Sequence, residues 1–150
     1  MSGRGTRAAY VAFAWALFTG VVHAFWVVAY FYWPAFGRVT LGPDFERLFG
    51  RPAFRVYDLV VAVLFVVAAL LALAVTRPTG AGLPRWFLVS GIWTATALLF
   101  LPGAAAVIRD TLVMFGIVTG EATPLMFYDF WFLLGGSLFA TVGVGLRQRT

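Results

Sequence analysis

Four long stretches of this 150-residue sequence carry almost no charge, and this feature constrains the fold more than any other. About 20 apolar residues suffice for a helix to cross the hydrocarbon core of a bilayer. Hydrophobic residues make up 62% of the chain and charged residues 11%, which is more apolar surface than a soluble domain of this size can bury. We therefore predict an all-α, single-domain integral membrane four-helix bundle with spans at residues 8–33, 54–76, 85–108 and 125–146.

The charged residues sort by connector, and this predicts the topology. Six arginines lie at the two ends of the sequence and in the connector between the second and third stretches: Arg4, Arg7, Arg77, Arg85, Arg147 and Arg149. All six acids lie in or beside the other two connectors: Asp44, Glu46, Asp58, Asp110, Glu121 and Asp129. Because basic residues concentrate on the cytoplasmic side of a membrane, we expect a multi-pass protein of the bacterial cytoplasmic (inner) membrane with both termini in the cytoplasm.

The composition also narrows the chemistry. The sequence has no cysteine, which excludes disulfides and cysteine-ligated metals, and one histidine with scattered acids matches no metal-site spacing. It contains no nucleophile-elbow, P-loop or dinucleotide-binding motif. The net charge of +5 reflects the predicted cytoplasmic side and indicates contact with anionic lipid headgroups, not with nucleic acid. We therefore expect no metal site, no cofactor, and membrane lipids as partners.

The segment 104–120 joins the third and fourth stretches, and its uncharged part is too short to span a membrane. Its apolar residues follow helical spacing, while Arg109 and Asp110 point elsewhere. We predict a kink or stop at Pro102-Gly103. Beyond it, the third helix extends and bends to lie as an interfacial helix at the outer surface. A re-entrant segment is the alternative.

Small residues mark the faces on which membrane helices pack, because helices in lipid associate through close backbone approach. The first stretch carries them at four-residue spacing: Ala12, Ala16, Gly20 and Ala24. His23, Asp58 and Asp129 fall on the small-residue faces of their stretches, where ionisable groups in membrane helices belong. His23 lies about 15 Å inside its stretch and Asp58 about one turn inside its own, so a direct bond between them would need helix tilt or a water.

These groups define a candidate polar pocket that opens to the outer side. The candidate residues are His23 at its floor, Trp26 beside it, Tyr30, Asp58 and Asp129 on its walls, and Arg109 near its mouth. Two structural roles compete with this hypothesis. The carboxylates can serve the macrodipole at the N-terminal ends of their helices. His23 can hydrogen-bond Thr19 or a neighbouring helix, a contact worth on the order of 1 kcal/mol.

Three short motifs resemble a known family. They are His23-Ala-Phe-Trp26, Arg51-Pro-Ala-Phe-Arg55 and Tyr128-Asp-Phe-Trp-Phe-Leu-Leu-Gly135. Together they resemble the small bacterial four-helix membrane proteins grouped as domain of unknown function 3995, and the resemblance covers most of the chain. It implies an integral membrane protein without an assigned activity, so it supplies an architecture and no mechanism.

Two functional hypotheses stay open. In the first, the protein is a non-catalytic module: an accessory subunit of a larger membrane complex, or a binder of lipid or another hydrophobic small molecule. In the second, it is a small membrane enzyme or a proton-coupled carrier in which His23 exchanges protons with the help of Asp58 or Asp129. The two differ in whether the histidine has a chemical role or a packing role.

Overall fold

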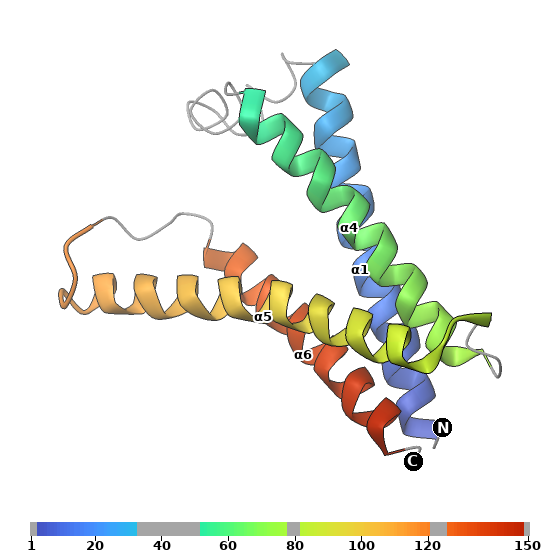
Figure 1. Cartoon of the computed structure of the whole chain (residues 1–150). Helices are drawn as coiled ribbons and strands as arrows, with labels where there is room; N and C mark the ends of the chain where they lie inside the picture. Colours follow the sequence, from blue (N-terminus) through green and yellow to red (C-terminus); the bar gives the residue numbers. More distant parts are fainter. Residues whose placement is uncertain (1–2, 33–51, 78–81, 121–125, 149–150) are drawn as a thin grey trace. The chain divides into compact units, whose positions relative to one another are not determined.

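Helices dominate the part of the chain that the structure, a computed structural model, describes: residues 3–32, 52–77, 82–120 and 126–148. Within these ranges the chain forms four helices and no strand (Figure 1): α1 (Gly3–Tyr32), α4 (Pro52–Thr76), α5 (Arg85–Met114) and α6 (Met126–Arg147). Each helix is long and apolar enough to cross a membrane. The prediction of an all-α chain with four helices of membrane-spanning character is confirmed.

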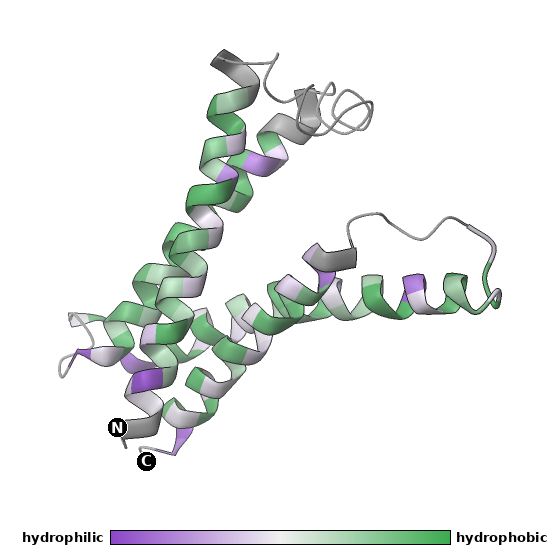
Figure 2. Cartoon of the chain, turned by 180° about the vertical axis from the view of Figure 1, so that it is seen from behind, coloured by the Kyte–Doolittle hydropathy of each residue, from purple (hydrophilic) through white to green (hydrophobic). Residues whose placement is uncertain are grey.

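Apolar residues surround each helix instead of forming one stripe. Figure 2 shows hydrophobic residues along most of every described helix. Large apolar side chains are exposed on all four, among them Phe18, Leu70, Leu101 and Phe130. A helix that is hydrophobic all round suits either a large protein core or a bilayer. A chain of 150 residues offers no such core, so lipid is the natural surrounding for these side chains.

The chain divides into two compact units, which are considered one at a time. The α1·α4 unit is Ala14–Ala69, and the α5·α6 unit is Met1–Phe13 with Leu70–Thr150. In the α1·α4 unit, a Cβ atom added at Gly20 would lie 3.1 Å from the Cβ atom of Phe65. The two helices therefore approach closely at this glycine, as its place on the small-residue face predicted.

The small-residue face of α1 holds over most of its length. Ala12 and Ala16 are fully buried, and Gly20 is buried with them. Ala24 is exposed, so the predicted four-residue series ends one turn early. A period of four residues drifts by about 40° per step from the 3.6-residue helical repeat, and by the fourth member this drift carries the residue off the contact face.

α5 runs through Pro102 without interruption and ends at Met114, six residues beyond the predicted span of 85–108. We predicted a kink or a stop at Pro102-Gly103, and the helix does not stop there. Proline removes one backbone donor, and membrane helices tolerate this when neighbouring helices and local adjustments satisfy the freed carbonyl. Residues 104–114 are the last turns of α5, so the predicted extension of the third helix is confirmed over this range, and its interfacial position stays a prediction.

The end of α5 is defined by a Schellman motif. Gly116 adopts φ +68°, a left-handed conformation that glycine enters without strain. Its N–H donates to the carbonyl of Val113 at 2.9 Å, and the N–H of Ile117 donates to the carbonyl of Leu112 at 2.9 Å. This pair of bonds satisfies carbonyls that the helix end would otherwise leave without partners.

In the α5·α6 unit, the two helices touch backbone to backbone at two glycines. A Cβ atom on Gly136 of α6 would lie 2.8 Å from the Cα atom of Phe100 in α5. A Cβ atom on Gly103 of α5 would lie 2.9 Å from the carbonyl oxygen of Asp129 in α6. The Pro-Gly pair in α5 thus marks a close helix approach and not a helix end.

Candidate functional site

The structure joins His23 and Asp58 directly. Nδ1 of His23 on α1 lies 2.7 Å from Oδ1 of Asp58 on α4. The His23 side chain keeps 15% of its exposure and the Asp58 side chain only 6%. Both residues belong to the α1·α4 unit and to segments of membrane-spanning character. The pair therefore forms a polar link between two apolar helices.

From the depths of the two residues in the sequence, a contact was expected to need helix tilt or a bridging water, and the structure has a direct contact without a water. His23 lies nine residues from the end of α1 at Tyr32, about 14 Å, and Asp58 lies six residues from the start of α4 at Pro52, about 9 Å. The difference of about 5 Å is one helical turn. Two side chains of this length can bridge one turn, so the faces predicted for both residues were sufficient to bring them together.

Aromatic and apolar groups surround the pair. The imidazole of His23 stacks on the ring of Phe65, with centroids 5.6 Å apart and an interplanar angle of 20°. Trp15 meets the same phenylalanine edge-on at 5.5 Å. The hydroxyl of Thr19 donates to the carbonyl of Trp15 at 2.8 Å, within its own helix. Of the two structural partners predicted for His23, the structure therefore supplies the neighbouring helix.

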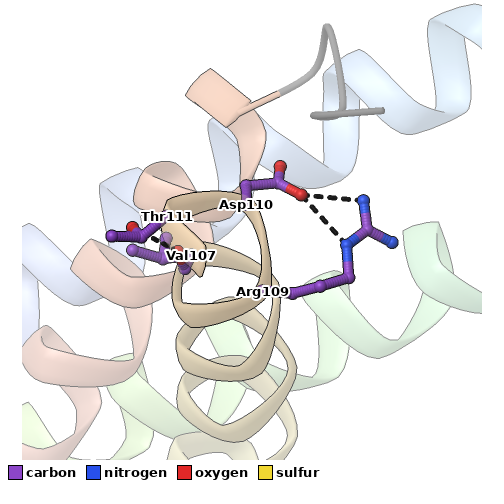
Figure 3. A network of polar contacts seen from close by, with 4 residues as sticks. All are labelled: Val107, Arg109, Asp110 and Thr111. Carbon is purple, nitrogen blue, oxygen red and sulfur yellow. Dashed lines mark hydrogen bonds and ion pairs between the residues drawn. The ribbon is translucent and has the colours of Figure 1, made fainter. Parts of the chain in front are cut away.

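A second charged pair lies on α5 and was not predicted as such. Nε and one terminal nitrogen of Arg109 donate to Oδ1 of Asp110 at 3.0 and 2.8 Å (Figure 3). The side chain of Asp110 is 0% exposed, whereas that of Arg109 is 57% exposed. The same view shows Thr111 donating to the carbonyl of Val107, a bond within one helix. We predicted that both charged residues point away from the apolar residues of this segment, but the side chain of Asp110 is buried and only that of Arg109 is exposed.

The burial of Asp110 follows from its place on the contact face of α5. That face comprises the buried residues Leu88, Ile92, Thr96, Leu99, Gly103 and Asp110. Asp110 comes seven residues after Gly103, which is two helical turns, so both lie on one side of the helix. The seven-residue spacing from Gly103 to Asp110 could have predicted this burial from the sequence. The adjacent Arg109 obscured it, because two neighbouring charges suggest a solvated segment.

The other candidate residues are distributed over both units. Trp26, half-buried, follows His23 by three residues on α1 and packs edge-on against Phe25. Asp129, half-buried, lies in the first turn of α6, in the unit that also contains Arg109. The side chain of Tyr30 lies outside the described residues. The structure brings His23 together with Asp58, and the pocket built from all six residues stays a prediction.

Among the described residues, no group of three or more histidine or acidic side chains could hold a metal ion. The functional groups of this site are an imidazole and a carboxyl group joined by a hydrogen bond. Such a pair can link two helices or bind a proton. Comparison of the chain with family models, curated proteins and solved structures found no match in any of the three. The family resemblance drawn from short motifs therefore stays an expectation.

Proposed function

We propose that the chain is a multi-pass protein of the bacterial cytoplasmic membrane with both termini in the cytoplasm. The four apolar helices support the membrane assignment, and the arginines at the two ends support the orientation. Reporter fusions at the two ends test it. A reporter that works only in the cytoplasm is expected to be active at both ends. A reporter that works only outside the cytoplasm is expected to be inactive at both ends. Activity on opposite sides of the membrane would contradict an even number of crossings.

Within that membrane, the protein acts as a non-catalytic module that binds lipid or another hydrophobic molecule, or serves as an accessory subunit of a larger complex. The observation that carries this proposal is the direct contact of His23 with Asp58. It gives the buried ionisable groups of α1 and α4 a structural use, as a link between helices in lipid. The exposed apolar side chains on all four helices supply the surface for hydrophobic partners.

Native purification in mild detergent, followed by mass spectrometry, tests this function. A specific lipid, hydrophobic molecule or membrane protein is expected to co-purify with the wild-type chain at a fixed ratio. The matched control is Ser90→Ala, because the Ser90 hydroxyl is exposed and bonds only within α5. Recovery of a bare monomer with the lipid composition of the bulk membrane would argue against a binding or accessory role.

A second candidate function is a proton-coupled carrier or small membrane enzyme that uses His23 with Asp58 or Asp129. The 2.7 Å contact favours it, because a hydrogen-bonded imidazole and carboxylate can exchange a proton. Proton uptake into proteoliposomes distinguishes the two functions. A carrier loses uptake in His23→Phe and keeps it in Ser90→Ala. Equal, background uptake in all three proteins would leave the non-catalytic module as the better account.

A further inference from the structure

The imidazole of His23 has two nitrogens, and the described protein uses only one of them. Nδ1 contacts Asp58, whereas Nε2 makes no hydrogen bond within the part of the chain that the structure describes. The imidazole also keeps more of its exposure than the carboxyl group does. Phe65 stacks on a face of the ring, a contact that does not use Nε2.

Net charge decides which atoms of the pair carry hydrogen. The other titratable side chain described in the α1·α4 unit is Tyr57, which is exposed. No described charge in this unit therefore offsets that of the pair. Because a net charge is strongly unfavourable in an apolar medium, the pair is stable there when its total charge is zero.

Three protonation forms have zero total charge. One of them, with hydrogen on Nδ1 and on Oδ2 of Asp58, puts a hydroxyl donor without a described partner on the more buried of the two side chains, which disfavours it. The other two agree on Nε2. In one, an imidazolium donates from Nδ1 to an ionised Asp58. In the other, a protonated Asp58 donates to Nδ1 of a neutral imidazole. Nε2 carries a hydrogen in both forms. The position of the proton between Nδ1 and Asp58 therefore does not matter for the role of Nε2, which is that of a hydrogen-bond donor.

A donor in this place calls for a neutral acceptor. His23 lies six residues inside the end of the Gly5–Ala29 span, about 9 Å along the helix. An N–H group away from water that lacks an acceptor forfeits a hydrogen bond. A phosphate would bring a charge into the same apolar region, whereas a carbonyl oxygen would not. Molecules that carry carbonyl oxygens in a bilayer include ester lipids and alkylated quinones.

We propose that Nε2–H of His23 donates a hydrogen bond to the carbonyl oxygen of an amphiphilic molecule of the bilayer, with Asp58 as the positioning residue. This inference rests on the proposed membrane function and names the ligand chemistry of the same site. It assigns His23 to ligand contact and Asp58 to the hydrogen bond that orients the ring.

The sequence makes the decisive experiment simple, because His23 is its single histidine. Labelling the full chain with ¹⁵N-histidine therefore reports on this residue alone. The labelled protein is reconstituted in nanodiscs of diether phosphatidylcholine, which lacks ester carbonyls. We expect Nε2 to show one-bond coupling to a proton. We expect this proton to shift downfield when diester lipid replaces diether lipid, or when an alkylated benzoquinone is added to the diether discs.

The two additions separate the sources of the carbonyl. A response to diester lipid identifies a lipid ester, and a response to the benzoquinone alone identifies a quinone; both support the proposal. An Nε2 atom without hydrogen, or an Nε2 proton that responds to neither addition, overturns it. Failure of the chain to enter nanodiscs at all would remove the membrane assignment and this inference together, so the two failures are distinguishable.

Matched variants then test the roles of the two residues. His23→Gln keeps an N–H group near the place of Nε2, whereas His23→Asn keeps polar atoms near Nδ1 only. Affinity for the responding probe is expected to fall about fivefold to tenfold in His23→Asn and less in His23→Gln. Asp58→Asn is expected to reduce the downfield shift, because it removes the carboxylate that orients and polarises the ring. Equal affinity in both histidine variants would contradict donation from Nε2.

Discussion

The two helix pairs place their charged residues differently. In the α1·α4 unit, the charged contact runs between helices, from His23 to Asp58. In the α5·α6 unit, Arg109 bonds its neighbour Asp110 within one helix. α5 and α6 meet through close backbone approach at glycines, and Arg85 of α5 donates to the backbone carbonyl of Leu146 in α6 at 2.9 Å.

The glycine contacts differ in the same sense. A Cβ atom at Gly136 would meet the backbone of Phe100 at 2.8 Å, whereas one at Gly20 would meet a side-chain atom of Phe65 at 3.1 Å. Apolar burial gives no net attraction between helices in lipid, so each pair needs another source of association. Close packing supplies it for α5·α6, and a hydrogen bond supplements looser packing for α1·α4.

The largest expected effect comes from a substitution that disrupts the close packing of α5 against α6. In Gly136→Ala, the new methyl group would overlap the backbone of Phe100, and backbone cannot rotate away as a side chain can. The helices must separate, at a cost of about 1–3 kcal/mol in the free energy of unfolding. Denaturant titration in mixed micelles, followed by tryptophan fluorescence, measures the loss.

Gly145→Ala on the same helix is the control for that substitution. The atom nearest to its added Cβ would lie 4.0 Å away, so the methyl group fits. A helix interior also prefers alanine to glycine by roughly 1 kcal/mol, which makes a small stabilisation the expected result. Equal losses in the two variants would show that the close approach at Gly136 does not hold α5 to α6.

The second-largest expected effect measures the hydrogen bond between α1 and α4. A double-mutant cycle of His23→Ala and Asp58→Ala is expected to give a coupling free energy of about 1 kcal/mol, typical of hydrogen bonds between membrane helices. The same micelle titration measures each corner of the cycle.

The control cycle uses Thr19, one turn before His23 on α1, in place of His23. Thr19→Ala combined with Asp58→Ala is expected to give a coupling near zero, because the Thr19 hydroxyl donates to Trp15 in its own helix. A His23–Asp58 coupling no larger than this control would mean that the 2.7 Å contact adds nothing to helix association.

Periodicity explains how much of the α1·α4 site could be predicted. The sequence placed His23 and Asp58 on the packed faces of their helices, because residue spacing fixes the angle of a side chain around its helix. It could not give the direct contact, since the axial offset between two helices depends on the loop and the packing. The side-chain reach then decides whether one turn of offset can be bridged.

In the α5·α6 unit, local sequence signals at Pro102 and Arg109 hid contacts that the structure shows. As a local signal Pro102 predicts a kink or a stop, but the helix continues, and Gly103 makes the same place a contact with α6. The low helix propensity of proline is a weak constraint where a neighbouring helix packs against the chain and satisfies its polar backbone groups. Tertiary packing therefore keeps α5 helical through Pro102. The buried Asp110 was missed for a related reason: its charged neighbour concealed its place on the contact face.

The smallest expected effect concerns the cation–π contact between α5 and α6, which are also joined by a hydrogen bond from Arg85 to the carbonyl of Leu146 at 2.9 Å. The guanidinium of Arg147 lies over the ring of Trp93, 5.0 Å from its centroid, at an exposed position near the end of α6. Arg147→Gln removes this cation–π contact and is expected to destabilise the unit by about 0.5–1 kcal/mol. The charge also favours the C-terminal end of the helix dipole, which contributes a similar amount. Repeating the substitution in a Trp93→Leu background separates the two terms in the same micelle titration. A loss that persists there in full belongs to the dipole, and the cation–π contact then adds nothing to the association of α5 with α6.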